Sequence, residues 1–278
     1  MNNLVVRTIT GVLYVAVIVA ALLHPLAATF LFALVTGLTV WEFTGIVNAR
    51  RDVETNRFIC TVAAVFFYVA MASFCSGATP PTVFVPYLIT IIYLLIAELY
   101  LKSADPINNW AYTMLSQLYI ALPLSLINVL AFRQGPAGAE YSGVLPLCVF
   151  IFLWANDTGA YCTGSLIGRH KLFPRISPGK TWEGSAGGAV VTIVAAVAVW
   201  RLTGGNGGLQ LHEWIGLSVV TVIFGTWGDL VESLLKRTLS IKDSGTILPG
   251  HGGMLDRFDS ALMAFPAAVI YLYSLTLF

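Results

Sequence analysis

The chain has 278 residues, of which 57% are hydrophobic and only 10% are charged, and its mean hydropathy is +0.81. Soluble domains carry about a quarter of their residues as Asp, Glu, Lys and Arg, so this chain has too little polar surface for a soluble globule. The composition predicts a membrane protein, in which lipid supplies the apolar solvent. The net charge of +1 indicates no particular partner, and we expect no nucleic-acid binding.

Apolar stretches close to the ~20 residues needed to cross a bilayer recur along the whole chain. Turn-forming pairs such as His24-Pro25 and Gly135-Pro136 separate them. We predict an all-α, polytopic integral membrane protein with about nine transmembrane helices, the first of them a retained span rather than a signal peptide. The predicted helices are 5–23, 26–48, 58–75, 82–101, 110–132, 144–165, 184–202, 213–236 and 257–277.

Polar residues are unevenly distributed over these helices. Residues 1–142 form nearly featureless apolar helices, whereas 143–278 contain most of the polar side chains and two long basic loops. We predict a single membrane domain, in which 1–142 is a hydrophobic scaffold and 143–278 holds the catalytic helices and cytoplasmic loops. The four cysteines lack metal-ligand spacing, and we expect them to pack as small apolar residues.

The basic residues predict an orientation. If the amino terminus is cytoplasmic, every Lys and Arg except Arg133 and Arg201 falls in or beside a cytoplasmic segment. The positive-inside rule therefore places the amino terminus and both long basic loops in the cytoplasm. A compact chain of this kind fits a bacterial inner membrane.

The eighth predicted helix ends in a polar stripe. Asp229, Glu232, Ser233 and Lys236 have the spacing i, i+3, i+4 and i+7, which places them on one face of a helix. Each acid at the centre of a membrane helix costs about 2.5–3.5 kcal/mol, so these acids need a cation or basic side chains as partners. A salt-bridged helix end is the structural alternative, and a functional site is the interpretation that we favour.

The following segment, 238–255, combines glycine with charge. The run Pro249-Gly250-His251-Gly252-Gly253 has glycines that let backbone N–H groups approach phosphate oxygens. The charged residues in and around the segment are Lys236, Arg237, Lys242, Asp243, Asp256, Arg257 and Asp259. Acids, bases and glycines this close together indicate a phosphate site more strongly than glycines alone.

Two pieces upstream support the same interpretation. Asn156 and Asp157 lie in the otherwise apolar sixth helix, where a carboxylate is a functional hypothesis by default. The basic loop 169–184 is either a topology anchor or a contact for phosphate or a lipid headgroup, with Lys180 as the best candidate. We expect the remaining small-residue pairs to be helix-packing contacts, namely Gly164/Gly168 and Gly184/Gly188.

This residue set suits a divalent cation that holds a polyphosphate. Mg²⁺ prefers one or two carboxylates plus substrate phosphates, and we predict Asp229 and Asp256 as its ligands. A lipid phosphate is already ionised near neutral pH, because its second pKa is about 6 by analogy with phosphoserine, so no strong general base is needed. The residues predict metal-dependent phosphoryl or nucleotidyl transfer at a membrane interface.

The run SLLKRTLSIKDSGTILPGHGGMLDRFD, 233–259, resembles the signature of phosphatidate cytidylyltransferases, the CDP-diacylglycerol synthases. That pattern is S-x-hydrophobic-K-R, four residues, K-D, and a Pro/Gly-x-H-G-G-hydrophobic-x-D-R-x-D ending. Asn156-Asp157, SPGKTWEG and Gly228-Asp229-x-x-Glu232-Ser233 are also similar to the family. Its members usually have a second Lys where this chain has Gly179. The resemblance covers roughly the last 125 residues.

The resemblance implies that phosphatidate attacks the α-phosphorus of CTP, with Mg²⁺, to give CDP-diacylglycerol and pyrophosphate in phospholipid biosynthesis. It implies metal ligation by Asp229 and Asp256, with Glu232 and Asp259 nearby. The implied phosphate and nucleotide contacts are Lys180, Lys236, Arg237, Lys242, Ser233, Asp243, His251, Gly252, Gly253 and Arg257, with Asn156 and Asp157 completing a polar cavity. The resemblance does not decide whether the nucleotide is CTP or dCTP, whether a second cation binds, or whether the protein is a homodimer.

Two other functions are considered beside this one. A CTP-dependent kinase of a polyprenol or another lipid alcohol would share the nucleotide chemistry but release CDP. An ion-coupled transporter would also bury carboxylates, although transporters tend to show paired repeats with broken helices at the bilayer midplane. Here the charges lie near one membrane face in one half of the chain.

Overall fold

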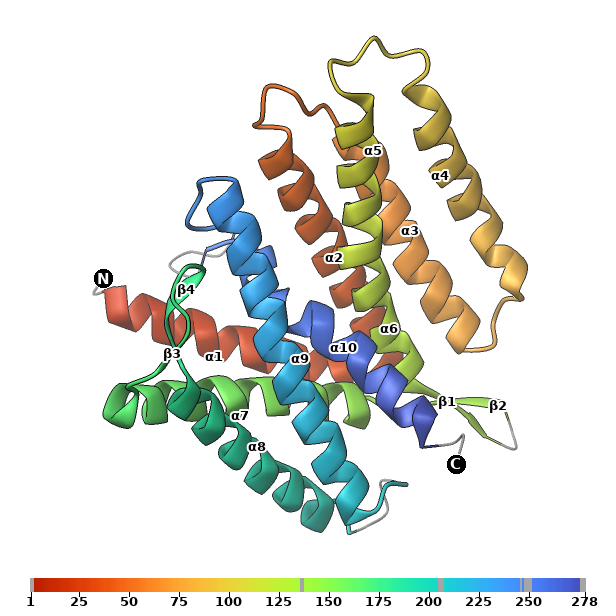
Figure 1. The fold of residues 1–278 in the computed structure, drawn as a ribbon. Coiled ribbons are helices and arrows are strands. Elements are labelled where there is room, and N and C mark those ends of the chain that lie inside the picture. Colours follow the sequence, from red (N-terminus) through yellow and green to blue (C-terminus); the bar gives the residue numbers. More distant parts are fainter. Residues whose placement is uncertain (1–2, 136–137, 205–207, 246, 248–251, 276–278) are drawn as a thin grey trace. The chain divides into compact units, whose positions relative to one another are not determined.

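The computed structural model describes residues 3–135, 138–204, 208–245, 247 and 252–275, and these residues form helices with two short hairpins (Figure 1). The chain forms two compact units. The first unit comprises Met1–Gly143 and Leu239–Phe258, and the second comprises Val144–Thr238 and Asp259–Phe278. The second basic loop, from Leu239 onward, therefore belongs to the first unit, whereas the helices on either side of it belong mainly to the second.

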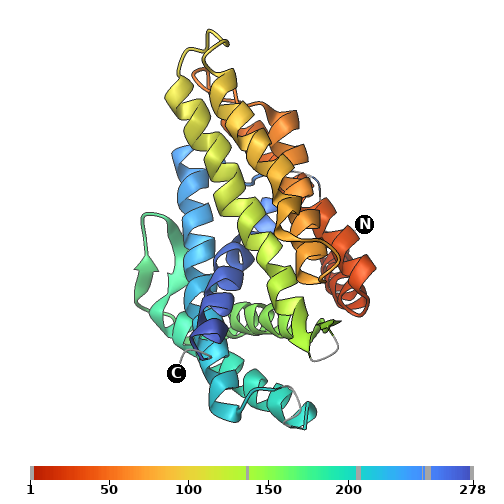
Figure 2. The same ribbon diagram turned by 90° about the vertical axis from the view of Figure 1, so that its right-hand side faces the viewer.

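The first unit is built around a group of long apolar helices. Its elements are α1 (Asn3–Leu22), α2 (Pro25–Val47), α3 (Arg57–Cys75), η1 (Pro81–Phe84), α4 (Val85–Ala97), α5 (Pro106–Leu115), η2 (Ser116–Ala121), α6 (Leu122–Ala131), β1 (Phe132–Gly135) and β2 (Gly138–Tyr141). Helices α2 and α3 lie side by side, and the continuous helix α5–η2–α6 packs against both (Figures 1 and 2). Their contact buries large side chains such as Phe43, Tyr68 and Leu124 completely.

Local sequence explains where these helices begin and bend. Asn56 and Asp105 cap the starts of α3 and α5, because their side-chain oxygens accept hydrogen bonds from the N–H groups of Ile59 and Asn108. The π-turn η2 lies just before Pro123, which has no N–H to donate to the preceding turn.

The second unit holds four long helices and a hairpin. Its elements are α7 (Val144–Ile167), β3 (Lys171–Phe173), β4 (Ser177–Thr181), α8 (Trp182–Leu202), α9 (Leu211–Thr238) and the part of α10 (Leu255–Ser274) from Asp259 onward. Helices α7 and α8 pack closely through glycine: a Cβ on Gly188 would lie 2.8 Å from the carbonyl oxygen of Asn156, and one on Gly184 would lie 2.9 Å from that of Ala160. The predicted packing role of these small residues is confirmed.

Every predicted span coincides with a helical segment of the described chain. Among the described residues, six helices are long and apolar enough to cross a membrane: α2, α3, the continuous helix Pro106–Ala131, α7, α8 and α9. Shorter apolar helices, Thr8–Leu22 and Pro81–Ala97, occupy the first and fourth predicted spans. The prediction of an all-helical, multi-pass membrane protein is confirmed, and all four cysteines are free.

Sequence analysis did not predict the two hairpins. Strands β1 and β2 pair antiparallel with Phe132 opposite Tyr141, and β3 and β4 pair with Lys171 opposite Thr181. The second hairpin forms within the segment that we expected to be a basic loop. Its last strand contains Lys180, so this lysine is carried by a paired backbone rather than by an irregular loop.

Candidate active site

Three carboxylates converge in the second unit. Asp229 and Glu232 project from α9 and Asp259 from α10, and their oxygens lie within 4.8 Å of one another. Gly228 allows this approach, because a Cβ there would lie 2.6 Å from the Asp259 carbonyl oxygen and 3.0 Å from Ser260 Cα. A larger residue at 228 would separate the two helices. We call Asp229, Glu232 and Asp259 the acid cluster.

Two lysines neutralise part of this charge. Lys180 Nζ lies 2.6 Å from Asp229 Oδ2, and Lys236 Nζ lies 2.6 Å from Glu232 Oε2. The Ser233 hydroxyl donates a hydrogen bond of 3.1 Å to Asp229 Oδ1. Glu232 is completely buried, so its charge depends on such partners. The predicted stripe on α9 thus has its members in contact, and Lys180 joins it from another element.

The hairpin that carries Lys180 is fixed to the start of α8. The Thr181 hydroxyl caps α8 by accepting from the Gly184 N–H at 3.1 Å. Glu183 accepts hydrogen bonds from the N–H groups of Arg169 and His170, each at 3.1 Å, and its other oxygen lies 2.5 Å from His170 Nδ1. These bonds close the hairpin at its base and hold Lys180 beside α9.

Arg237 links the end of α9 to the hairpin turn. Its Nε donates to the carbonyl oxygen of Ile176, in the hairpin turn, at 3.4 Å. The Arg237 side chain is exposed, so the end of α9 presents a positive charge next to the hairpin.

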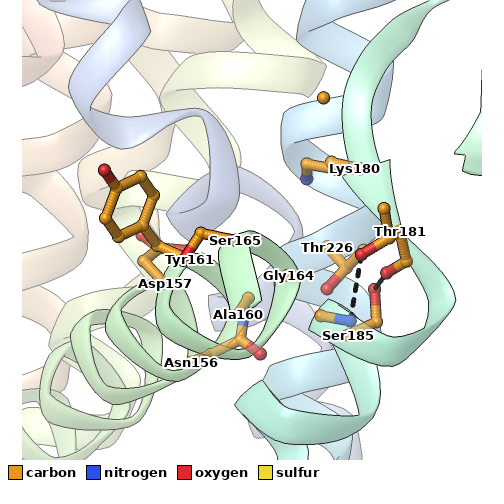
Figure 3. Close-up of a pocket in the computed structure, with 12 residues that line it drawn as sticks. Asn156, Asp157, Ala160, Tyr161, Gly164, Ser165, Lys180, Thr181, Ser185 and Thr226 are labelled. Atoms are coloured by element: carbon orange, nitrogen blue, oxygen red, sulfur yellow. Dashed lines mark hydrogen bonds between the residues drawn. The ribbon is translucent and has the colours of Figure 1, made fainter. Parts of the chain in front are cut away.

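A cavity of about 430 Å³ opens beside Lys180 (Figure 3). Helix α7 lines it with Asn156, Asp157, Ala160, Tyr161, Gly164 and Ser165; the hairpin and α8 with Gly179, Lys180, Thr181, Gly184 and Ser185; and α9 with Thr226. Asp157, which we expected to complete a polar cavity, lines this one and is exposed. The Asn156 Oδ1 atom is buried and accepts no hydrogen bond from the residues that the structure describes.

The remaining predicted residues belong to the first unit. Asp256 Oδ2 accepts hydrogen bonds from Ser244 N at 2.9 Å and Gly253 N at 2.8 Å. Gly252 has φ +86°, a conformation that favours glycine, and a Cβ there would lie 2.6 Å from Asp256 Oδ2. The segment before α10 therefore wraps around this carboxylate.

Three predicted residues near this segment, namely Lys242, Asp243 and Arg257, are exposed. His251 lies outside the described residues. Asp229 and Asp256 belong to different units, and their shared metal ligation stays a prediction.

Sequence reasoning missed several residues of these sites, among them Thr181, Thr226 and Glu42. Thr181 and Thr226 line the cavity, and their types alone carry no signal in an apolar chain. Glu42 in α2 contacts Ser244 and Met254 in the first unit. A single acid inside an apolar span was a usable signal for Glu42, because such residues are functional by default.

Comparison with known proteins decides the family. The profile of the Cytidylyltransferase family matches residues 5–275. The chain belongs to the cytidylyltransferase family. The match extends from α1 into the last residues of α10, so the apolar helices of the first unit, which the signature leaves out, are part of the family's sequence pattern as well.

Curated relatives agree with this assignment along their whole length. A phosphatidate cytidylyltransferase of Haemophilus influenzae is 33% identical over 280 residues, covering 94% of this chain and 95% of the relative. Phosphatidate cytidylyltransferases of Staphylococcus aureus and Staphylococcus haemolyticus are 31% and 32% identical over 270 residues, covering 96% of this chain and 98% of each relative. The predicted family and enzyme class are confirmed.

Proposed function

We propose that this chain transfers a cytidylyl group from CTP to phosphatidate, giving CDP-diacylglycerol and pyrophosphate in phospholipid biosynthesis. A phosphate oxygen of phosphatidate forms a bond to the α-phosphorus of CTP, and the bond between that phosphorus and the oxygen bridging to the β-phosphate breaks. The observation that carries the proposal is the acid cluster, in which Lys180 pairs with Asp229 and Lys236 with Glu232, in a chain matched over nearly its full length by enzymes named for this reaction.

The acid cluster fits a hard divalent cation. All of its donors are carboxylate oxygens, which Mg²⁺ prefers, and its three carboxyl groups outnumber the ammonium groups of Lys180 and Lys236. Asp229 and Asp256 are the proposed Mg²⁺ ligands, and Glu232 and Asp259 lie beside Asp229 in the second unit. When bound, Mg²⁺ neutralises polyphosphate charge and makes the α-phosphorus more electrophilic.

The basic residues are proposed to bind phosphate groups. Lys180 and Lys236 stand at the acid cluster, where they would neutralise phosphate oxygens as pyrophosphate departs. Arg237 and Lys242 are exposed, which leaves them accessible to the soluble nucleotide. The remaining proposed contacts to the substrates are Ser233, Asp243, His251, Gly252, Gly253, Arg257, Asn156 and Asp157.

The proposed location is the bacterial inner membrane, with the site facing the cytoplasm. The distribution of Lys and Arg supports this orientation, and the relatives come from bacteria. A site at the cytoplasmic ends of membrane helices would meet a soluble nucleotide on one side and a lipid phosphate held in the bilayer on the other.

The decisive experiment measures products from purified protein in phosphatidate-containing nanodiscs. With CTP and Mg²⁺ we expect pyrophosphate and CDP-diacylglycerol, and neither when phosphatidate or Mg²⁺ is omitted. Diacylglycerol in place of phosphatidate is the matched lipid control, because it has the same chains without the phosphate. Release of CDP would indicate a kinase instead, and absence of lipid-dependent pyrophosphate would refute the proposal.

A further inference from the structure

One buried acid of the first unit has no place in the chemistry proposed so far. Glu42 lies within the apolar helix α2 and is only 6% exposed. A carboxylate in such a position is costly unless its oxygens accept hydrogen bonds. The partners of Glu42 therefore indicate what this residue does.

Both oxygens of Glu42 accept from the signature segment before α10. Oε1 accepts from the Ser244 hydroxyl, and Oε2 accepts from the Met254 N–H at 2.7 Å. One side chain thus holds two points of the chain that are ten residues apart. We call the described residues 244, 245, 247 and 252–254 the signature loop.

The fit around Glu42 leaves no room for a larger side chain. A Cβ on Gly253 would collide with Glu42 Oε1 and with Ser244 Oγ, and one on Gly245 would lie 2.8 Å from Glu42 Oε2. Glycine has more conformational freedom to lose on ordering than other residues, so a loop of this composition needs fixed anchors.

The same anchors hold Asp256. Ser244 donates its hydroxyl to Glu42 and its N–H to Asp256 Oδ2, and its Oγ accepts from the Asp256 N–H at 3.3 Å. Gly253 N–H donates to Asp256, while the next residue, Met254, donates to Glu42. Glu42 and Asp256 are thereby joined through Ser244 and through the Gly253–Met254 backbone.

We propose that Glu42 is a positioning residue that fixes the signature loop and, through it, the Asp256 carboxylate. The inference rests on the proposed function, because Asp256 is a metal ligand in that proposal. Glu42 itself would touch neither substrate nor cation. Its loss would leave Ser244 and Met254 without their acceptor and allow the loop and Asp256 to move.

The first test replaces Glu42 with Leu, which has a similar size, suits an apolar helix and cannot accept a hydrogen bond. Misplacement of a catalytic group by about 1 Å can lower turnover about 100-fold, and we expect Glu42→Leu to lower kcat about 10- to 100-fold. The Mg²⁺ concentration for half-maximal activity should rise, and the KM for phosphatidate should stay unchanged.

Two further variants separate positioning from a general folding defect. Glu42→Gln keeps an acceptor for Met254 and should lie between wild type and Glu42→Leu. Glu98→Leu is the control, because Glu98 is another acid of the first unit, at the end of the apolar helix α4, and it accepts hydrogen bonds from Asn109 and none from the signature loop. It should retain wild-type kcat and Mg²⁺ dependence.

A second readout needs no enzyme activity. Hydrogen exchange of the amides of Ser244, Gly253 and Met254 should quicken in Glu42→Leu and stay unchanged in Glu98→Leu. If the wild type is inactive, the proposed function fails while this readout still tests the anchor. Wild-type exchange in Glu42→Leu, or wild-type kcat and Mg²⁺ dependence in the folded variant, would overturn the inference.

Discussion

Carboxylates of the two units have different kinds of partner. In the first unit, Glu42 and Asp256 accept hydrogen bonds from backbone N–H groups and from the Ser244 hydroxyl. In the second unit, Asp229 and Glu232 face lysine side chains, and a third carboxylate lies close by. Backbone donors are fixed by the fold, whereas lysine side chains can rotate towards another anion.

The difference indicates two uses for an acid at a membrane surface. An acid held by backbone donors orders a loop, and its loss should appear as local disorder. An acid that is paired with lysine and lies beside other acids can bind a cation, while its lysine partner can bind a polyphosphate. Loss of such an acid should abolish catalysis with little change in the fold.

The largest effect is expected for Asp229→Asn. The amide keeps the shape but removes the charge that is proposed to hold Mg²⁺, and pyrophosphate release should fall about 10²- to 10³-fold or more. The midpoint of thermal unfolding should stay the same or rise, because one of three converging acids is neutralised.

Asp256→Asn should lose activity as well, but with faster hydrogen exchange in the signature loop. Wild-type metal-dependent turnover in either folded variant would contradict the proposed ligation.

A smaller loss is expected for Lys180→Ala. Removal of the ammonium group 2.6 Å from Asp229 should raise the KM for CTP and lower kcat/KM about 10- to 100-fold, which a titration of CTP will measure. Lys180→Arg should restore part of the loss, since the charge returns in a different shape. Lys171→Ala is the control, because Lys171 lies exposed on the same hairpin. Equal losses in the two alanine variants would refute a specific role for Lys180.

Gly253→Ala tests the first unit at its tightest point. The added methyl group would collide with Glu42 Oε1 and Ser244 Oγ, so the loop must shift, and we expect kcat to fall about tenfold. Hydrogen exchange at Met254 should quicken at the same time. An unchanged exchange rate together with lower turnover would show that the loss arises elsewhere than in the Glu42 anchor.

The sequence predicted features that depend on local periodicity. The stripe on α9 follows from helical spacing, and Asp229, Ser233 and Lys236 lie as that spacing requires. Asp259 lies close to Asp229 and Glu232 because α9 and α10 pack together at Gly228. A contact between two helices leaves no pattern in the local sequence, so this proximity could not be predicted. Glu42 is 202 residues from Ser244, so sequence alone could mark it as an unusual acid without naming its partner.

The β3–β4 hairpin was missed for a similar reason. Its pairing sets Lys171 opposite Thr181, and the segment between them has Pro174 in the turn and Pro178 in β4, so that it resembles an irregular loop in the sequence. The hairpin is fixed by the hydrogen bonds that Glu183 accepts from the N–H groups of Arg169 and His170, which precede it by fourteen and thirteen residues. Lys180 was predicted by its charge and position, but its contact with Asp229 required this folded hairpin.

The smallest effect is expected at Gly179, where the resemblance to the family implies a second lysine. A Cβ at this position would have no atom within 4 Å, so Gly179→Lys should fold normally and place a positive charge beside Lys180 at the cavity. An exposed charge contributes up to about 1 kcal/mol, and the KM for CTP should fall by up to about fivefold at low salt. The gain should shrink as ionic strength rises, because salt screens exposed charges. Gly179→Gln, which has no charge, is the control. If it lowers the KM equally, the effect comes from packing or hydrogen bonding, and the cavity does not bind CTP through positive charge.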